Sequence, residues 1–296
     1  MRQVCLGIID DMARKKREKN GNTDGFRQLL KCMVAVFFLY YGMRLWSCER
    51  SNDLSPYPDV NLDEMEELDL ARHAYDWDRL QWNDSFVSYE DERYTSLQGI
   101  DVSQHQKEID WQKVAQSGIK FAFIRVGYRG TSLGNVYPDK YFEANIKGAL
   151  ENGIEVGIYF FSQAITTQEA AQEAQYVIDH IQGYDVTYPV VFDMEDPEDG
   201  SLGRAESLDR QAQTEIALTF LACIEEAGYQ GMLYDSSMLF SQDYMLGYLE
   251  TTRLWVADYA SYPKYPYVFE IWQYSSKGQV DGIEGNCDMD IRFVPR

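Results

Sequence analysis

From residue 98 onward, short apolar runs alternate with longer amphipathic stretches. The short runs are rich in β-branched and aromatic residues, a pattern that predicts strands. They are Gly99–Val102, Phe121–Gly127, Glu155–Phe161, Pro189–Glu195, Met232–Asp235, Leu254–Tyr259 and Ile271–Tyr274. The longer stretches predict helices near Asp110–Gln116, Tyr141–Asn152, Gln168–Ile181, Arg210–Ala227 and Gln242–Leu249. This alternation predicts a parallel sheet. Because the strands are apolar on both faces, a closed, TIM-like (β/α) barrel is favoured.

Acidic residues stand at the ends of several predicted strands. The run YPVVF at residues 188–192 leads directly into Asp193 and Glu195. Residues two apart on a strand point to the same side, so these two carboxylates are expected to share one face. Asp101 in GIDVS, Asp258 in LWVADYA and Asp288 in NCDMD end other runs. Active sites of such barrels lie at these strand ends, although acids there also commonly cap helices or line solvated loops.

The residue types around these acids narrow the chemistry. No GxGxxG, Walker or GxSxG motif is present at any predicted strand–helix junction. The remaining alternatives are carboxylate-driven glycoside cleavage and a magnesium-dependent phosphoryl site. A phosphoryl site favours nearby Lys or Arg, and only Arg125 is close to a strand end.

Aromatic residues near the predicted strand ends favour a sugar substrate over a phosphoryl group. Flat rings stack on sugar faces, while core packing is the alternative explanation for each ring. These residues are Tyr128, Tyr159, Phe161, Trp255, Tyr259, Trp272 and Tyr274. Three scattered histidines and five cysteines without CxxC or zinc spacing predict neither a metal site nor a cofactor.

Charge divides the chain unevenly around its net value of −21. Residues 1–50 hold ten Lys and Arg against five Asp and Glu, whereas residues 51–97 hold three against thirteen. The strongly acidic remainder argues against nucleic acid as a partner, since phosphate binding needs clustered basic residues. The segment 48–97 is interpreted as an acidic linker or stalk, with packing of its aromatic residues on the domain as the alternative.

An apolar run, CMVAVFFLYYGM at residues 32–43, follows a basic N-terminal block. We interpret residues 29–47 as a signal anchor or transmembrane helix, with a cleaved signal peptide or a core helix as alternatives. By the positive-inside rule, residues 1–28 are then cytoplasmic and the rest of the chain is extracellular, at the cell membrane. If the signal is cleaved, the product is secreted.

Seven motifs in sequence order resemble one known family. They are GIDVSQHQ with IDW, FAFIRVGY, the spacing Asp139-Phe142-Asn145-Ala149-Gly153, GIYFFSQA, PVVFDME, LWVADYA, and IWQYSS with a late D-x-D. In this order they are similar to the glycoside hydrolase family 25 lysozymes, which are N-acetylmuramidases that act on peptidoglycan. The resemblance covers about residues 98–293. It departs at Lys107, where a glycine often follows HQ, and at Asp290, where asparagine is usual.

The resemblance implies an irregular barrel with fewer helices than a full eightfold one, here over residues 98–296. It also implies that Asp101, Asp193 and Glu195 form the acidic cluster of the family's groove, with Glu195 as proton donor and Asp288 as a further acid. Asp193 is expected to orient the substrate's N-acetyl group or to act as nucleophile. Substrate binding is expected from Tyr128, Tyr159, Trp255, Asp258, Trp272, Tyr274 and Asp288. A non-catalytic peptidoglycan-binding module and a chitinase-like hydrolase are the alternatives.

Overall fold

The structure is a computed structural model that describes residues 69–83, 86–196 and 203–296. The expected basic segment at 1–28, the anchor at 29–47 and the first part of the linker lie outside these residues. In the part that is described, no helix has the length and apolar character needed to cross a membrane. The anchor and the extracellular location therefore stay predictions.

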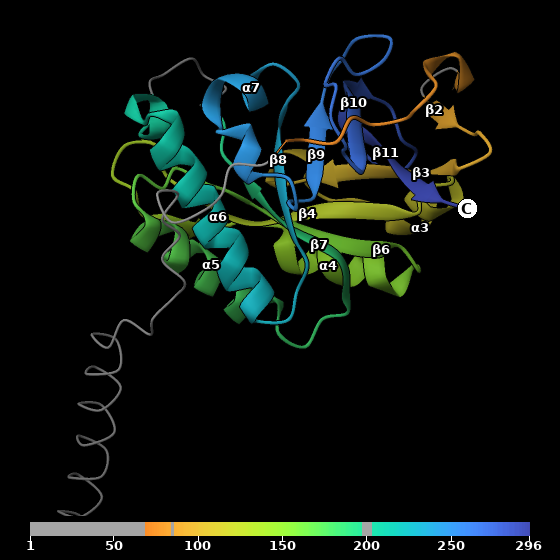
Figure 1. The fold of residues 1–296 in the computed structure, drawn as a ribbon. Helices are drawn as coiled ribbons and strands as arrows, with labels where there is room; N and C mark the ends of the chain where they lie inside the picture. The colour runs from red at the N-terminus through yellow and green to blue at the C-terminus, as the bar shows by residue number, and fades with distance from the viewer. Residues whose placement is uncertain (1–68, 84–85, 197–202) are drawn as a thin grey trace, which may run out of the picture. The chain divides into compact units, whose positions relative to one another are not determined.

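An eight-stranded barrel forms the centre of the domain (Figure 1). Its strands, in sheet order, are β3 (Tyr94–Val102), β11 (Cys287–Pro295), β10 (Ile271–Gly278), β9 (Leu254–Ala257), β8 (Gly231–Ser236), β7 (Val186–Asp193), β6 (Glu155–Phe161) and β4 (Phe121–Arg129). Pairing of β3 with β4 closes the barrel, and β5 (Val136–Pro138) pairs with the end of β4. The predicted α/β barrel is confirmed. Strand β11, which runs antiparallel to both neighbours, was not predicted.

Helices cover only part of the barrel. They are α3 (Trp111–Gln116), α4 (Phe142–Glu151), α5 (Thr167–Ile181), α6 (Arg210–Glu226) and α7 (Leu239–Asp243). Figure 1 shows α4, α5 and α6 along one side of the barrel. Short 3₁₀ turns occupy Trp77–Arg79, Gln104–Gln106, Ala205–Ser207 and Leu246–Tyr248. The helix expected at 242–249 is wrong: α7 ends at Asp243, since Tyr244 is extended and its carbonyl accepts hydrogen bonds from Arg210.

Local signals explain where the other helices begin and end. The Thr166 hydroxyl accepts a hydrogen bond from the Glu169 amide at 3.1 Å, so Thr166 caps α5 as its spacing predicts. Gly118, Gly153 and Gly228 follow helices α3, α4 and α6 with φ values of 96°, 72° and 90°. Lys107 has φ 58°, the one positive value among the described non-glycine residues. Glycine adopts positive φ without steric strain, which explains why a glycine often follows HQ in the family; nothing in the structure explains the lysine.

The described residues 69–83 and 86–97 pack on the barrel and do not form a solvated linker. They include β1 (Leu80–Asn83), β2 (Phe86–Tyr89) and the first four residues of β3, so the boundary expected at residue 98 falls within a strand. Val87 and Tyr89 are fully or almost fully buried. The ring of Tyr75 stacks on Phe293 of β11 at 4.1 Å. Aromatic residues therefore cover the β10–β11 side, and burial of these rings outweighs the acidic composition on which the linker interpretation rested.

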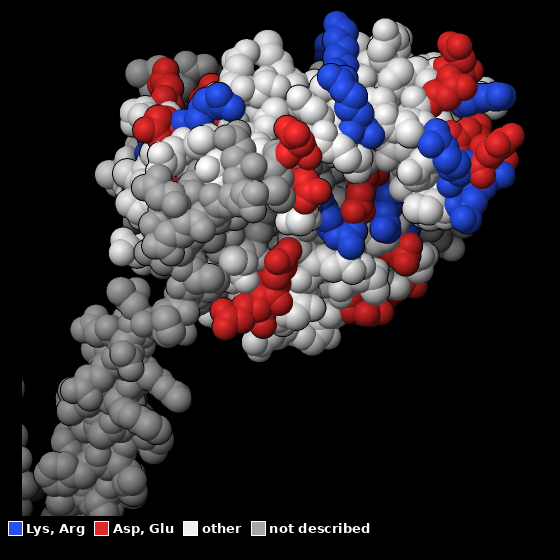
Figure 2. Space-filling model, viewed as in Figure 1, with Lys and Arg blue, Asp and Glu red and all other residues white. Residues whose placement is uncertain are grey.

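Two apolar clusters follow from the strict alternation of side chains along the strands. The cluster inside the barrel includes Phe121 and Phe123 of β4, Val191 of β7 and Trp255 of β9. The outer cluster, between barrel and helices, takes the alternate positions, such as Ala122 and Ile124. On the face of the molecule in Figure 2, acidic and basic side chains are interspersed among uncharged ones. The interior is thus apolar, and polar groups collect where the parallel strands end.

Candidate active site

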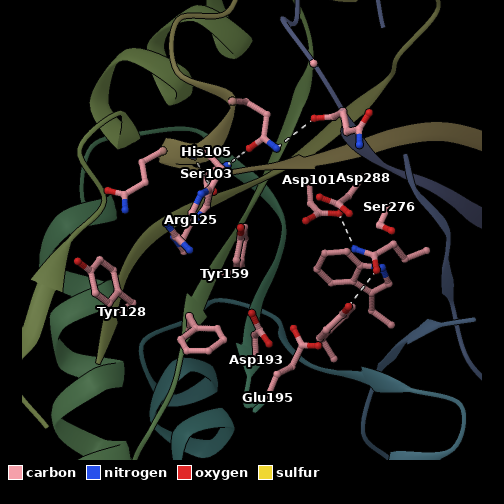
Figure 3. Close-up of a pocket in the computed structure, with 18 of the residues that line it drawn as sticks. Asp101, Ser103, His105, Arg125, Tyr128, Tyr159, Asp193, Glu195, Ser276 and Asp288 are labelled. Carbon is pink, nitrogen blue, oxygen red and sulfur yellow. Dashed lines mark hydrogen bonds between the residues drawn. The ribbon is translucent and has the colours of Figure 1, made fainter. Parts of the chain in front are cut away.

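A cavity of about 770 Å³ opens at the C-terminal ends of the parallel strands. Seven of the ten residues predicted for the site line it (Figure 3): Asp101, Tyr128, Tyr159, Asp193, Glu195, Trp255 and Asp288. They come from strands that are far apart in the sequence, or from residues just after them. The barrel brings these strands to one edge, as the parallel arrangement predicts.

Asp193 and Glu195 lie side by side at the end of β7 (Figure 3). Asp193 is the last residue of the strand and is only 5% exposed. Burial raises the pKa of Asp193 well above its ordinary value, and the charge of Glu195 and a hydrogen bond between the two side chains raise it further. A hydrogen bond between two carboxyl groups requires one proton. The pair therefore holds one proton at pH values where isolated carboxyl groups have lost theirs.

Three further carboxyl groups meet where β3 pairs with β11. Asp101 lies directly opposite Asp288, and Asp290 follows two residues later on the same face of β11. Burial raises the pKa of Asp101 well above its ordinary value, with the charges of Asp288 and Asp290 adding to the shift. Asp290 is fully buried and accepts a hydrogen bond from the indole nitrogen of Trp255 at 2.9 Å. Asp101 and Asp288 line the same cavity, and Asp290 is buried next to them.

Gln273 of β10 fixes the Asp101 side chain. Its amide nitrogen donates to Asp101 Oδ2 at 2.8 Å. Its amide oxygen accepts hydrogen bonds from the hydroxyl groups of Tyr234 and Tyr259, at 2.9 and 2.7 Å. Because the two hydroxyl groups occupy the amide oxygen, the nitrogen must face Asp101. The orientation of Gln273 is thus determined by its neighbours.

Arg125 is the only Lys or Arg among the described residues that line the cavity. Its guanidinium pairs with Asp139 at 2.9 Å and lies 5.4 Å from the centre of the Tyr128 ring. Asp139 Oδ2 also accepts the Gln104 amide at 2.9 Å, which ties the loop after β3 to β4. Because the Arg125 guanidinium already pairs with Asp139, most of its positive charge is neutralised by that carboxylate. The cavity acids consequently have little cationic compensation.

Three predicted substrate-binding residues do not line the cavity. Trp272 and Tyr274 flank the inward-facing Gln273 on β10 and so point outward, where both rings contact Trp82. The Asp258 carboxylate accepts backbone amides of Ala260 and Lys264, at 3.1 and 2.9 Å, and organises the loop after β9. These positions correspond to core packing and loop capping, the alternative explanations given for aromatic and acidic residues.

The prediction omitted several residues that line or support the cavity, namely Tyr234, Gln273, Tyr259, Arg125 and Asp290. The alternation of side chains along each strand could have identified these residues from the sequence. Once Trp255 is placed inside, Ala257 and Tyr259 follow on the same side, and on β10 the inward set is Ile271 and Gln273. Applied strictly, this alternation selects Gln273 and rejects its two aromatic neighbours.

The chemistry available to this arrangement is proton transfer and charge stabilisation. Carboxyl groups from two places in the barrel line one open cavity, and burial favours their protonated forms. Throughout residues 69–83, 86–196 and 203–296, no three or more His, Cys, Asp or Glu side chains form a group suited to a metal ion. The carboxyl groups that line the cavity suit acid-assisted cleavage of a bond.

Comparison with known proteins agrees with the resemblance drawn from the motifs. A family model described as glycosyl hydrolases family 25 matches residues 100–283. The protein YegX of Escherichia coli O157:H7 is 34% identical over 218 residues, which cover 70% of this chain and 73% of YegX. Lysozyme M1 of Streptomyces globisporus is 29% identical over 203 residues, 66% of this chain and 67% of that protein.

A solved structure extends the likeness to the fold. The modular autolysin LytC of Streptococcus pneumoniae, in complex with a synthetic peptidoglycan ligand, has a TM-score of 0.58 and 25% sequence identity. The match covers 67% of this chain and 47% of LytC, so this chain spans about half the length of that protein. Since the family model matches well over half of the residues and YegX is similar over most of both chains, this chain belongs to the glycosyl hydrolases family 25 and is a glycoside hydrolase.

Proposed function

We propose that this protein is a lysozyme that hydrolyses the β-1,4 bond between N-acetylmuramic acid and N-acetylglucosamine in peptidoglycan. The observation that carries the proposal is the Asp193–Glu195 pair, which lies side by side at the end of β7 in the open cavity. Two similar proteins support the substrate class, since Lysozyme M1 is a relative and LytC was solved with a synthetic peptidoglycan ligand. The pair supplies the proton that glycoside cleavage requires.

In the proposed reaction, Glu195 is the general acid. Departure of the sugar oxygen as an alkoxide is unfavourable, so a proton must reach that oxygen as the bond breaks. Asp193 and Glu195 together hold one proton, and Glu195 is the more exposed member of the pair. Glu195 is therefore the member placed to donate that proton to a substrate in the cavity.

Asp193 assists the substrate's own N-acetyl group in this proposal. A retaining pair of carboxyls that acts by direct attack stands about 5–5.5 Å apart, and an inverting pair about 6.5–9.5 Å. Asp193 and Glu195 lie side by side and reach the cavity from the same side, an arrangement that favours attack by the substrate's own acetamide. An ionised Asp193 would instead orient the acetamide and stabilise the positive charge that develops on its nitrogen as its oxygen attacks the anomeric carbon. Direct attack by Asp193 is the competing mechanism.

The second group of acids is assigned to binding and charge stabilisation. Asp101, held by Gln273, and Asp288 face the same cavity as the catalytic pair. Tyr159 is 9% exposed on the cavity wall, and we assign its hydroxyl a hydrogen bond to the acetamide. Tyr128 lies at the mouth beside Arg125 and offers a ring face to a sugar.

Mass spectrometry of fragments released from purified peptidoglycan tests this function. Cleavage by a muramidase leaves a reducing N-acetylmuramic acid end, and a glucosaminidase leaves reducing N-acetylglucosamine. Chitin oligomers assayed in parallel separate a chitinase-like hydrolase. Glu195→Gln should lower kcat on peptidoglycan by about 10²–10⁴-fold while the unfolding temperature is retained. Turnover near that of the unchanged enzyme would remove Glu195 from the acid role.

A further inference from the structure

Two consecutive residues of the loop between β6 and α5 hold the main chain that carries the catalytic pair. The Ser162 amide donates to the Asp193 carbonyl at 2.6 Å. The Gln163 side-chain nitrogen donates to the Glu195 carbonyl at 2.8 Å. Asp193 belongs to β7, but Glu195 lies two residues beyond the end of that strand. The Gln163 side chain thus restrains the main chain at Glu195 where the sheet no longer does.

Gln163 is itself held from the opposite side. Its side chain is fully buried, and its amide oxygen accepts the backbone amide of Arg204 at 2.9 Å. The Gln163 backbone carbonyl accepts Arg204 Nη1, also at 2.9 Å. The same guanidinium makes two bonds, of 2.8 and 3.1 Å, to Glu169 in the first turn of α5. A chain of polar contacts therefore runs from α5 through Arg204 and Gln163 to Glu195.

We propose that Gln163 is a positioning residue for Glu195, and that Arg204 and Glu169 set its orientation. The inference rests on the proposed function, in which Glu195 is the general acid. Proton transfer requires a donor about 2.6–3.2 Å from the accepting oxygen. A displacement of about 1 Å costs about 10²-fold in rate. A residue that fixes the Glu195 peptide therefore affects turnover without touching the substrate.

Only an amide side chain of this length can both donate a hydrogen bond to the Glu195 carbonyl and accept one from the Arg204 backbone amide. Gln163 donates one hydrogen bond to a carbonyl and accepts another from an N–H group. An ionised glutamate accepts hydrogen bonds but has no proton to donate to the Glu195 carbonyl, and methionine provides neither function at similar volume. Gln163→Met therefore removes the polar contacts with little change in packing. Gln211→Met is the matched control, because Gln211 is exposed on α6 and bonds to Glu215.

Two substrates separate positioning of the acid from general damage. Peptidoglycan has a poor leaving group that needs protonation, whereas an aryl glycoside of the same disaccharide with an acidic phenol does not. Gln163→Met should lower kcat on peptidoglycan about 10–100-fold with little change in KM, and lower aryl glycoside turnover less than about threefold. Arg204→Lys, which keeps the charge but loses the two-pronged contact with Glu169, should act in the same direction by about 3–10-fold.

Equal losses on both substrates, or no loss on peptidoglycan, would overturn the positioning role. Thermal unfolding of each variant checks the fold, and Arg204→Lys supplies the test if Gln163→Met does not fold. Glu195→Gln is measured beside them on both substrates. If Glu195→Gln keeps its peptidoglycan turnover, the proposed function fails. If Glu195→Gln loses it and neither Gln163→Met nor Arg204→Lys does, only the positioning role fails.

Discussion

Two groups of partly or fully buried acids lie near the C-terminal ends of the barrel strands, and they differ in their partners. The cavity acids, Asp101, Asp193, Glu195, Asp288 and Asp290, face one another, and Arg125 is the only Lys or Arg among the cavity-lining residues described. The second group, which we call the arginine cluster, is Arg129, Glu169, Glu173 and Arg204. In the arginine cluster each carboxylate pairs with a guanidinium.

The two groups differ in whether the negative charge of each carboxylate is compensated by a neighbouring cation. Arg129 pairs with Glu173 at 2.5 Å, and the Ser162 hydroxyl donates to the same carboxylate. Burial still raises the pKa of Glu173 to about 7, while the charge of Arg129 opposes the shift. The cavity acids lack this compensation, so they retain protons and are available for chemistry. Burial alone does not identify a catalytic acid, so its charged partners and its place at the cavity must be known as well.

Among the variants that test the difference between the cavity acids and the arginine cluster, Asp193→Asn should have the largest effect, which is a loss of activity. We expect kcat on peptidoglycan to fall about 10²–10⁴-fold, because the asparagine cannot stabilise the charge that forms on the acetamide. The same variant should unfold at a higher urea concentration at pH 8, since it no longer buries a carboxyl group. Steady-state kinetics and urea unfolding measure the two effects. If Asp193→Asn loses stability at pH 8, the inference that burial of the Asp193 carboxyl group destabilises the fold is wrong.

The mechanism at Asp193 is tested by the substrate. If the N-acetyl group is the nucleophile, a glycan whose muramyl units are de-N-acetylated should resist cleavage, and the first product formed should retain the β-configuration. If Asp193 attacks directly, the de-N-acetylated glycan is cleaved with retention. Proton NMR of the first product gives the anomer. Inversion would contradict both mechanisms.

The next largest effect is on stability, in Arg129→Met. This change leaves Glu173 buried without its cation, and removal of one partner from a buried pair costs about 3–5 kcal/mol. Glu173 has a raised pKa, so its protonation offsets part of the cost at low pH. The penalty should therefore be small at pH 5 and grow as pH rises through about 7. Urea unfolding at both pH values measures it, and Arg129→Met with Glu173→Met should recover part of the loss at pH 8.

A smaller effect is expected from Asp290→Asn. Burial raises the pKa of Asp290 well above its ordinary value, so the folded state holds a proton that the unfolded state releases above about pH 4. Stability from this group is present below that pH and is lost as pH rises. Asp290→Asn should leave stability at pH 4 unchanged and raise it by about 1–2 kcal/mol at pH 8. Urea unfolding across this range gives the slope, and an unchanged slope would show that Asp290 is ionised in the folded protein.

Much of the barrel follows from local patterns, and its exceptions follow from contacts between distant segments. The β6 strand has the predicted limits, Glu155–Phe161, because its apolar run is bounded by polar and turn residues. Strand alternation predicted that Asp193 and Glu195 share one side; both line the cavity, although β7 ends at Asp193 and Glu195 lies beyond it. The packing of residues 69–83 and 86–97 was only the alternative interpretation, because the acidic composition of this segment resembles that of a linker and the benefit comes from rings such as Phe293, about two hundred residues away.

The arginine cluster is the part of the site that the sequence concealed most completely. Arg129, Glu173 and Arg204 stand on three separate elements, and nothing in their spacing relates them. Whether an acid has a cation beside it depends on tertiary contacts, and that distinction separates the two groups of acids. Asp258 illustrates the same difficulty, since it ends an apolar run as Asp193 does yet accepts backbone amides of its own loop. Strand position predicts where an acid is, but its partners determine its role.

The smallest effect is expected where an ion pair is exposed to water. Lys147 and Glu143 form such a pair on α4 at 2.9 Å, with side chains 54% and 76% exposed. Solvent and salt screen this interaction, and most exposed pairs contribute little to stability. Lys147→Gln should therefore leave the unfolding temperature and peptidoglycan turnover unchanged within error. If it destabilised the protein as much as Arg129→Met, the cost of that variant would come from losing an ion pair as such and not from leaving a charge buried, and the contrast between the two groups of acids would lose its physical basis.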